Sequence, residues 1–257
     1  MKLHPIARTR LEKAALDNGF DLDLDVTGSW LRYGSSQAPL KIRLSALGEG
    51  FFLVAFSMGN VAASLTGVGT KLAHPMPTGA VGARSVAEIP ALHRLLRRAF
   101  QLSRTLPDEL LHAFQQKTAG LPDTTEAERL VVQRVGQDIY RKGLLDYWEG
   151  RCAVTGLAVP ALLRASHIKP WADCATDAER MDVFNGFLLA PHLDAAFDRG
   201  FITVADDGVV VVSERLDADA RALLGLVDGL KVAGLTDGHR GYLPWHREKV
   251  FDGEGDG

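Results

Sequence analysis

The sequence predicts an α+β fold in two domains, and three observations lead to this prediction. Strand-like segments gather in the first half of the chain, with helical segments before and after them. A stretch rich in turn-forming residues, TAGLPDT, interrupts the chain at residues 118–124. Beyond it, short apolar segments alternate with polar residues and predict strand, loop, strand and helix. We therefore expect a mixed domain of helices and strands over residues 1–120 and a second domain over residues 121–257.

The composition is that of an ordinary globular protein. Of the 257 residues, 46% are hydrophobic, and 29 basic against 32 acidic residues leave a net charge of −3. This charge gives no general support to nucleic-acid binding, although a local basic patch is enough to contact phosphate. No apolar run approaches the length of a membrane span, and the start of the chain lacks the apolar core of a signal peptide. We therefore expect a cytoplasmic protein with no membrane partner.

The first domain is expected to open with a helix and to continue in strands. Apolar residues at helical spacing predict a helix over residues 5–18, which Gly19 ends. Strand-like pieces follow at residues 30–33, 41–44 and 51–56. Residues 61–84 are rich in Gly, Ser, Thr and Pro and predict a long loop, which is either functional or a plain connector.

A second helix is expected after this loop. Ser85 and Glu88 have the spacing of a capping box, and the segment ALHRLLRRAFQLSR then keeps its leucines on one face. A charge run on the opposite face is in most proteins a solvated surface. Because Glu88 is the one acid nearby, we interpret this run as a ridge that contacts phosphate. Its members are Arg94, Arg97, Arg98 and Arg104. A short helix, DELLHAFQQ, follows.

A long helix is expected to lead into the second domain. Thr125 and Glu128 form another capping box, and apolar spacing carries the helix to about Trp148. Arg134 and Arg141 lie seven residues apart on it and point roughly the same way. Near the end of the domain, FITVADDGVVVVS predicts a hairpin that turns at Asp-Gly.

The residues with reactive side chains gather between these two features, in RCAVTG, RASHIKPW and NGFLLAPHLDAAFDRG. Pro170 follows His167 closely, so the backbone there is expected to be extended. Asn185-Gly186 is a turn signal before a short buried strand, and HLDAAFD has helical spacing. This order would bring an imidazole to one side of a small site and the pair His192 and Asp194 to the other.

These pieces resemble the HNH endonuclease family, in its branch of predicted restriction endonucleases. The resemblance covers about residues 125–251 and includes RVGQDIYRKGLL and WHREKVF as well as the three segments above. It implies a ββα-metal (HNH) nuclease domain with a helical lead-in and a β-hairpin extension. Some relatives are braced by a four-cysteine zinc site, which the two cysteines of this chain cannot form.

The resemblance also implies roles for single residues. His167 would activate water, and Asn185 would hold the loop and orient His167. The last metal-binding His of the family is expected nine residues after Asn185, where this chain has Asp194, and His192 is the other candidate ligand. The residue before His167, often acidic in the family, is Ser166. Such ligands suit Mg²⁺, Mn²⁺, Ni²⁺ or Zn²⁺ without choosing among them.

Further side chains around this motif receive simpler interpretations. Asp198 is expected to be a structural carboxylate that caps the following turn. Trp171 and Pro170 are expected to wall the site, and Lys169 to touch phosphate. Cys152 is interpreted as a small buried hydrophobe.

Double-stranded DNA, plain or modified, is the expected partner, and the first domain is expected to select the target. A restriction role is the leading context, and a homodimer is expected because one such site cuts one strand at a time. Two alternatives stay open: a DNA-binding or sensor protein with a degenerate HNH unit, and a nuclease acting on RNA or non-specifically, such as a toxin. The expected DNA contacts are Arg94, Arg97, Arg98, Arg104, Arg134, Arg141 and Lys169.

Overall fold

The computed structural model describes residues 3–47, 50–72, 76–106, 108–122 and 124–253. It divides into two compact units, Met1–Glu109 and Leu110–Gly257, and the α+β class is confirmed. The division lies before the predicted boundary at residue 120, because helix α4 (Glu109–Thr118) packs on helix α5 (Glu126–Tyr147). Within the described residues, no helix is both long and apolar enough to cross a bilayer.

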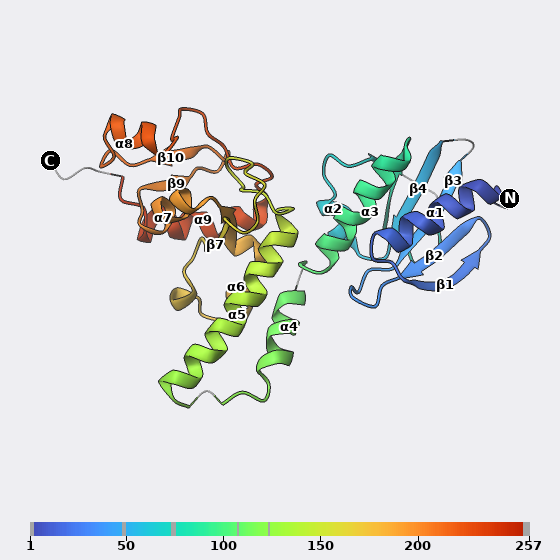
Figure 1. Ribbon diagram of the computed structural model, residues 1–257, viewed down its shortest axis with the longest axis horizontal. Helices are drawn as coiled ribbons and strands as arrows, with labels where there is room; N and C mark the ends of the chain where they lie inside the picture. The colour runs from blue at the N-terminus through green and yellow to red at the C-terminus, as the bar shows by residue number, and fades with distance from the viewer. Residues whose placement is uncertain (1–2, 48–49, 73–75, 107, 123, 254–257) are drawn as a thin grey trace. The chain divides into compact units, whose positions relative to one another are not determined.

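The first unit is an antiparallel sheet with helices packed on it (Figure 1). Six strands lie in the order β1-β2-β3-β4-β6-β5, and the side chains of Ile42, Leu44, Val54 and Phe56 form the buried floor. The helices contribute Leu11, Leu92, Leu95 and Leu96 to the same core. The strands are β1 (Leu22–Thr27), β2 (Trp30–Gly34), β3 (Ile42–Leu47), β4 (Phe51–Phe56), β5 (Thr70–Lys71) and β6 (Gly82–Val86); the helices are α1 (Pro5–Asp17), α2 (Gly59–Ser64) and α3 (Ile89–Ser103).

Several predictions for this unit are confirmed and others are wrong. Gly19 ends α1 with a φ of +88°, a backbone conformation that favours glycine. The predicted loop over residues 61–84 instead holds most of α2, the strand β5 and the start of β6. The predicted capping box is wrong, because Ser85 lies in β6 and Glu88, the N-cap of α3, makes no side-chain capping bond.

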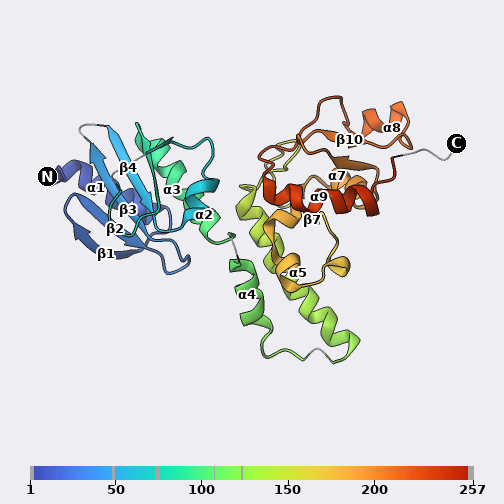
Figure 2. The same ribbon diagram turned by 180° about the vertical axis from the view of Figure 1, so that it is seen from behind.

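The second unit is built around α5, with the ββα motif packed against it (Figure 2). The predicted capping box of α5 is confirmed: Thr125 Oγ1 accepts from Glu128 N, and the Glu128 carboxylate accepts from Thr125 N. Gly136 and Gly143 lack side chains where Phe114 and Leu110 of α4 approach α5. These close approaches fix α4 beside the long helix, as both views show.

The motif itself consists of β7 (Arg164–His167), β8 (Gly186–Leu189) and α7 (Pro191–Asp198). The two strands are antiparallel, with His167 paired to Gly186 and Ser166 to Phe187. The predicted hairpin is confirmed as β9 (Ile202–Val204) and β10 (Val210–Val212). The remaining elements are the turns η1 (Trp171–Asp173) and η2 (Val183–Asn185) and the helices α6 (Asp177–Met181), α8 (Ala218–Leu223) and α9 (Asp237–Lys249).

Candidate active site

His167 stands at the end of β7, and protein groups hold its ring on three sides. The ring of Tyr140, from α5, stacks on it with centroids 3.9 Å apart and planes at 12°. Trp171 meets it edge-on, with centroids 6.1 Å apart at 88°. The third contact is at Nε2, which lies 3.0 Å from the carbonyl oxygen of Arg180. The imidazole is therefore fixed in both position and tilt.

The contact at Nε2 also decides where the proton sits. A carbonyl oxygen only accepts hydrogen bonds, so Nε2 must carry the hydrogen, and Nδ1 keeps its lone pair. Burial lowers the pKa of His167 to about 4, against a smaller opposing effect of the Arg180 carbonyl. Within the described residues, Nδ1 has no hydrogen-bond partner. The neutral ring thus offers one free basic nitrogen, which is what a general base needs.

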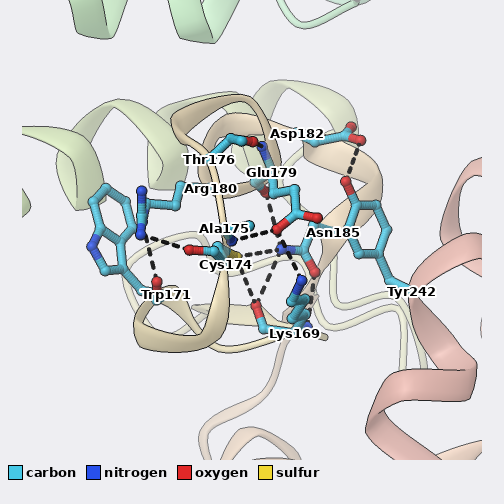
Figure 3. A network of polar contacts seen from close by, with 10 residues as sticks. All are labelled: Lys169, Trp171, Cys174, Ala175, Thr176, Glu179, Arg180, Asp182, Asn185 and Tyr242. Atoms are coloured by element: carbon cyan, nitrogen blue, oxygen red, sulfur yellow. Dashed lines mark hydrogen bonds and ion pairs between the residues drawn. The ribbon is translucent and has the colours of Figure 1, made fainter.

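Asn185 is fully buried and its side chain ties down the loop between β7 and β8 (Figure 3). Its Oδ1 accepts from Lys169 N at 2.8 Å, and its Nδ2 donates to the carbonyl oxygens of Lys169 at 3.1 Å and Glu179 at 3.0 Å. The Cys174 sulfur lies 3.3 Å from Nδ2. The Asn185 side chain thus holds the Glu179 carbonyl, and the next residue, Arg180 of α6, presents its own carbonyl to His167 Nε2.

Three charged side chains make further bonds within this loop. Lys169 Nζ pairs with Glu179 Oε2 at 2.9 Å, and the same oxygen accepts from Ala175 N at 2.7 Å. The Arg180 guanidinium donates to the carbonyl oxygens of Trp171 and Cys174, at 3.2 and 2.6 Å. It also lies over the Trp171 ring, 5.7 Å from the centroid. Figure 3 shows how these bonds link residues that are distant in the loop. We call this hydrogen-bonded loop, residues 169–185, the clamp.

Asp194 and Asp198 form a carboxylate pair on α7, below Ser166. They are four residues apart, so both lie on one side of the helix. Ser166 Oγ donates to Asp198 Oδ1 at 3.0 Å. Burial and then the charge of Asp198 raise the pKa of Asp194, against the opposing effects of Ser166 and Arg164. The pKa of Asp198 is raised by burial as well. Both carboxylates are thus held at some electrostatic cost.

His192 does not join this pair. It lies two residues before Asp194, about 200° further round the helix. Its side chain is exposed at the surface, away from the buried side of α7. The geometry thus favours Asp198 over His192 as the partner of Asp194, and the i, i+4 spacing of the two aspartates is the sequence signal that points to it.

The carboxylates of α7 supply part of the donor set that a divalent ion requires. Among the described residues, no three or more His, Cys, Asp or Glu side chains converge to hold a metal ion. Mg²⁺ is nevertheless commonly bound by one or two carboxylates, with water and substrate phosphate supplying the other oxygens. Asp194 and Asp198 fit this pattern, since a cation would favour the charged form of Asp194, whose pKa is raised by burial and then by the charge of Asp198.

A pocket of about 370 Å³ opens beside His167 and Asp198. Gln137 of α5, one turn after the exposed Arg134, forms part of its wall, and so do His246 and Val250 from the end of the chain. Resemblance had pointed to His167 and to the wall residues Pro170 and Trp171, but not to Gln137 or His246. The lining residues are Gln137, Ala165, Ser166, His167, Ile168, Pro170, Trp171, Asp198, His246 and Val250.

The basic side chains expected to contact DNA lie in different surroundings. In α5, Arg134 is exposed, whereas Arg141 donates to the carbonyl oxygens of Leu163 and Pro160 at 2.6 and 3.0 Å. Lys169 is the ion-paired side chain of the clamp. In the first unit, Arg94 and Arg97 are exposed, Arg98 is half-buried, and Arg104 lies over the Phe100 ring.

Residues 152–205 match the family model described as HNH endonuclease. The match includes β7, β8 and α7, and so His167, Asn185, Asp194 and Asp198, but not Tyr140 or His246. A comparison with curated proteins finds no match. HNH nucleases generally use a divalent metal ion. The second unit thus contains a segment, residues 152–205, that is similar to HNH endonucleases, and this likeness supports the predicted family resemblance.

Proposed function

We propose that the protein is a metal-dependent DNA endonuclease in which His167 is the general base. The observation that carries this proposal is the contact of His167 Nε2 with the Arg180 carbonyl oxygen, which sets the tautomer of the ring. The Arg180 carbonyl occupies Nε2 and leaves Nδ1 as a free base in a ring that lines the pocket beside Asp198. A neutral, immobilised imidazole in the same pocket as Asp198 suits metal-assisted hydrolysis of a phosphodiester by general-base catalysis.

The steps assigned to the chain's own residues follow from this geometry. Nδ1 of His167 takes a proton from a water molecule, whose oxygen attacks the phosphorus atom of the scissile phosphate while the bond from phosphorus to the leaving oxygen breaks. Tyr140, Trp171 and the Arg180 carbonyl keep the imidazole from turning while the proton moves. Asp194 and Asp198 would hold a divalent cation. When bound, the cation neutralises charge on the phosphate and stabilises the leaving oxygen.

We propose further that the first unit selects the target and that the working context is restriction of plain or modified DNA. Support comes from the exposed arginines of α3, which stand on a compact unit separate from the nuclease domain. The homodimer stays a prediction of the same proposal, as does a contact of Arg134, Arg141 or Lys169 with phosphate.

The central test replaces His167 with alanine. Purified protein should nick or cleave plasmid DNA with Mg²⁺ or Mn²⁺ and not with a chelator present. His167→Ala should lower the rate by about 10²–10⁴-fold, the usual effect of losing a general base. His112→Ala, at an exposed histidine of α4, is the matched control and should cleave like wild type.

The substrates and outcomes separate the candidate functions. Duplex DNA, single-stranded DNA, RNA and DNAs with modified bases are offered in parallel. Wild-type-like cleavage by His167→Ala contradicts the assignment of the base. Preferred cleavage of RNA points to an RNA-directed nuclease. DNA binding without cleavage under every metal condition points to a sensor protein with an inactive HNH unit.

A further inference from the structure

Tyr140 lies outside the matched HNH segment, yet its ring has the closest stacking contact with His167. It belongs to α5, a helix that precedes β7 in the chain and is separated from it by residues 148–163. Its side chain is almost completely buried, and its ring lies parallel to the imidazole at 3.9 Å. Of the three groups that hold His167, it is the one that covers a whole face of the ring.

The hydroxyl of Tyr140 fixes the ring at its far end. It donates to the backbone carbonyl of Asn185 at 2.8 Å, and Ile168 N donates to the same oxygen at 3.0 Å. Burial raises the pKa of Tyr140 well above its usual value, so the hydroxyl stays protonated and remains a donor. One carbonyl thus ties α5 to the residues that follow β7 and precede β8.

Gly186 shows how closely this hydroxyl fits. Its φ of −173° is ordinary extended backbone, so no turn requires a glycine here. A Cβ at this position would collide with the Tyr140 hydroxyl and lie 2.7 Å from the Ser166 carbonyl oxygen. The close approach of Tyr140 therefore explains why residue 186 is a glycine. The predicted turn at Asn185-Gly186 does not explain it.

Because this proposal rests on the proposed role of His167, it concerns the same site. We propose that Tyr140 is a positioning residue. Its ring stacks on the His167 imidazole and sets the plane of that ring, and its hydroxyl holds the Tyr140 ring in place through the bond to the Asn185 carbonyl. The imidazole comes from β7, within the matched HNH segment, and α5, which lies outside that segment, holds its orientation. No contact of Tyr140 with substrate is needed for this role.

The test separates the two parts of Tyr140. Tyr140→Phe keeps the ring and removes the bond to Asn185, so most of the cleavage rate should remain. Tyr140→Leu removes the ring, and a misplaced base can cost about 10²-fold in rate. The matched control is Tyr147→Leu on the same helix, where the buried Tyr147 packs on Trp148 and Phe184 and makes no stack with His167.

A rescue experiment distinguishes positioning from a purely structural role. His167→Gly leaves a slot for a ring beside Tyr140 and Trp171, and added imidazole should restore part of the cleavage. When Tyr140→Leu is added to His167→Gly, the imidazole concentration for half-rescue should rise about 3- to 10-fold, the ratio expected for losing one ring pair. Adding Tyr147→Leu should leave that concentration unchanged.

Nuclear magnetic resonance of the histidine rings gives a readout that does not depend on cleavage. Stacking on Tyr140 should shift the His167 ring protons upfield, and Tyr140→Leu should abolish this shift while Tyr140→Phe retains it. Unchanged ring signals or an unchanged half-rescue concentration in Tyr140→Leu would overturn the proposal. If wild-type protein cleaves nothing, the proposed function fails instead, and the ring signals alone then decide whether Tyr140 holds His167.

Discussion

At the scale of single residues, the site joins a neutral imidazole to a pair of carboxylates that repel each other. The distinctive member is Asp198, which the hydroxyl of Ser166 holds at 3.0 Å. In many relatives an acid is expected at the position of Ser166. Ser166 itself is uncharged, and its hydroxyl donates a hydrogen bond to the Asp198 carboxylate, which α7 supplies.

The metal ligands give the first prediction at this scale. Asp194→Asn and Asp198→Asn should each weaken Mn²⁺ binding by about ten-fold or more, because each removes one of two anionic oxygen donors. His192→Ala should have a smaller effect, since its side chain is exposed away from the pair. Isothermal calorimetry on folded variants measures the affinities.

Asp219→Asn, on the exposed surface of α8, controls for the general loss of one negative charge. If His192→Ala proves the most damaging of the substitutions, the metal is held from the other side of α7 and the pairing of Asp194 with Asp198 is not the ligand set.

At the scale of elements, α3 presents two exposed arginines, Arg94 and Arg97. Replacing Arg94 and Arg97 together with glutamine should weaken DNA binding, and the slope of log affinity against log salt should fall by about two, one for each lost phosphate contact. The measurement uses the His167→Ala background, so that the DNA stays intact, and fluorescence anisotropy at several salt concentrations.

The control removes the same charge elsewhere in the unit, at the exposed Arg10 and Lys41. An equal loss of affinity in both double variants would mean that overall charge, and no ridge on α3, governs binding. An unchanged salt slope in Arg94→Gln/Arg97→Gln would remove α3 from the interface.

The helices and strands also show which features can be predicted from the sequence and which cannot. Spacing and capping residues predicted α5 and its Thr125 cap, because these signals are local. Strand β1 was missed, since Asp23 and Asp25 are rare in strands and its pairing with β2 is what stabilises it. The motif placed His167 and Asn185, but the stacking of Tyr140 joins positions 27 residues apart and has no local signal.

At the scale of the whole molecule, the described part of the second unit holds three neutral imidazoles parallel to aromatic rings: His239 and His246 are buried and His167 is half-buried. Besides His167 on Tyr140, His239 lies at 11° to Phe187 and His246 at 12° to Phe197. Burial is the main cause that lowers their pKa values, to about 4 for His167, about 3 for His239 and about 4 for His246. The fold of this unit is therefore linked to pH.

The sign of this linkage follows from the unfolded chain, where histidine has a pKa of about 6.5. As the pH falls below that value, the unfolded state takes up protons before the folded state does, so the free energy of unfolding decreases. Each such histidine contributes a slope of about 1.4 kcal/mol per pH unit until its folded pKa is reached. Urea unfolding between about pH 7 and pH 5 should show this fall.

His246→Gln keeps polar atoms near Thr203 and Phe197 and removes one titrating group. The slope of its free energy of unfolding against pH should therefore be smaller by about the contribution of one histidine. A free energy of unfolding that stays level over this range would show that these rings titrate alike in the folded and unfolded chain.

The buried Asn185 has a consequence for chemical ageing. Asn-Gly is the dipeptide in which the backbone nitrogen most readily attacks the side-chain amide, releasing ammonia and leaving an acid or a lengthened backbone. Here the amide is locked by the oxygens of Lys169 and Glu179, and Asn185 has no exposed surface. The folded chain is protected against a reaction to which the unfolded chain is open. A carboxylate formed there would face those same carbonyl oxygens, so each hour spent unfolded reduces the fraction that can rebuild the clamp.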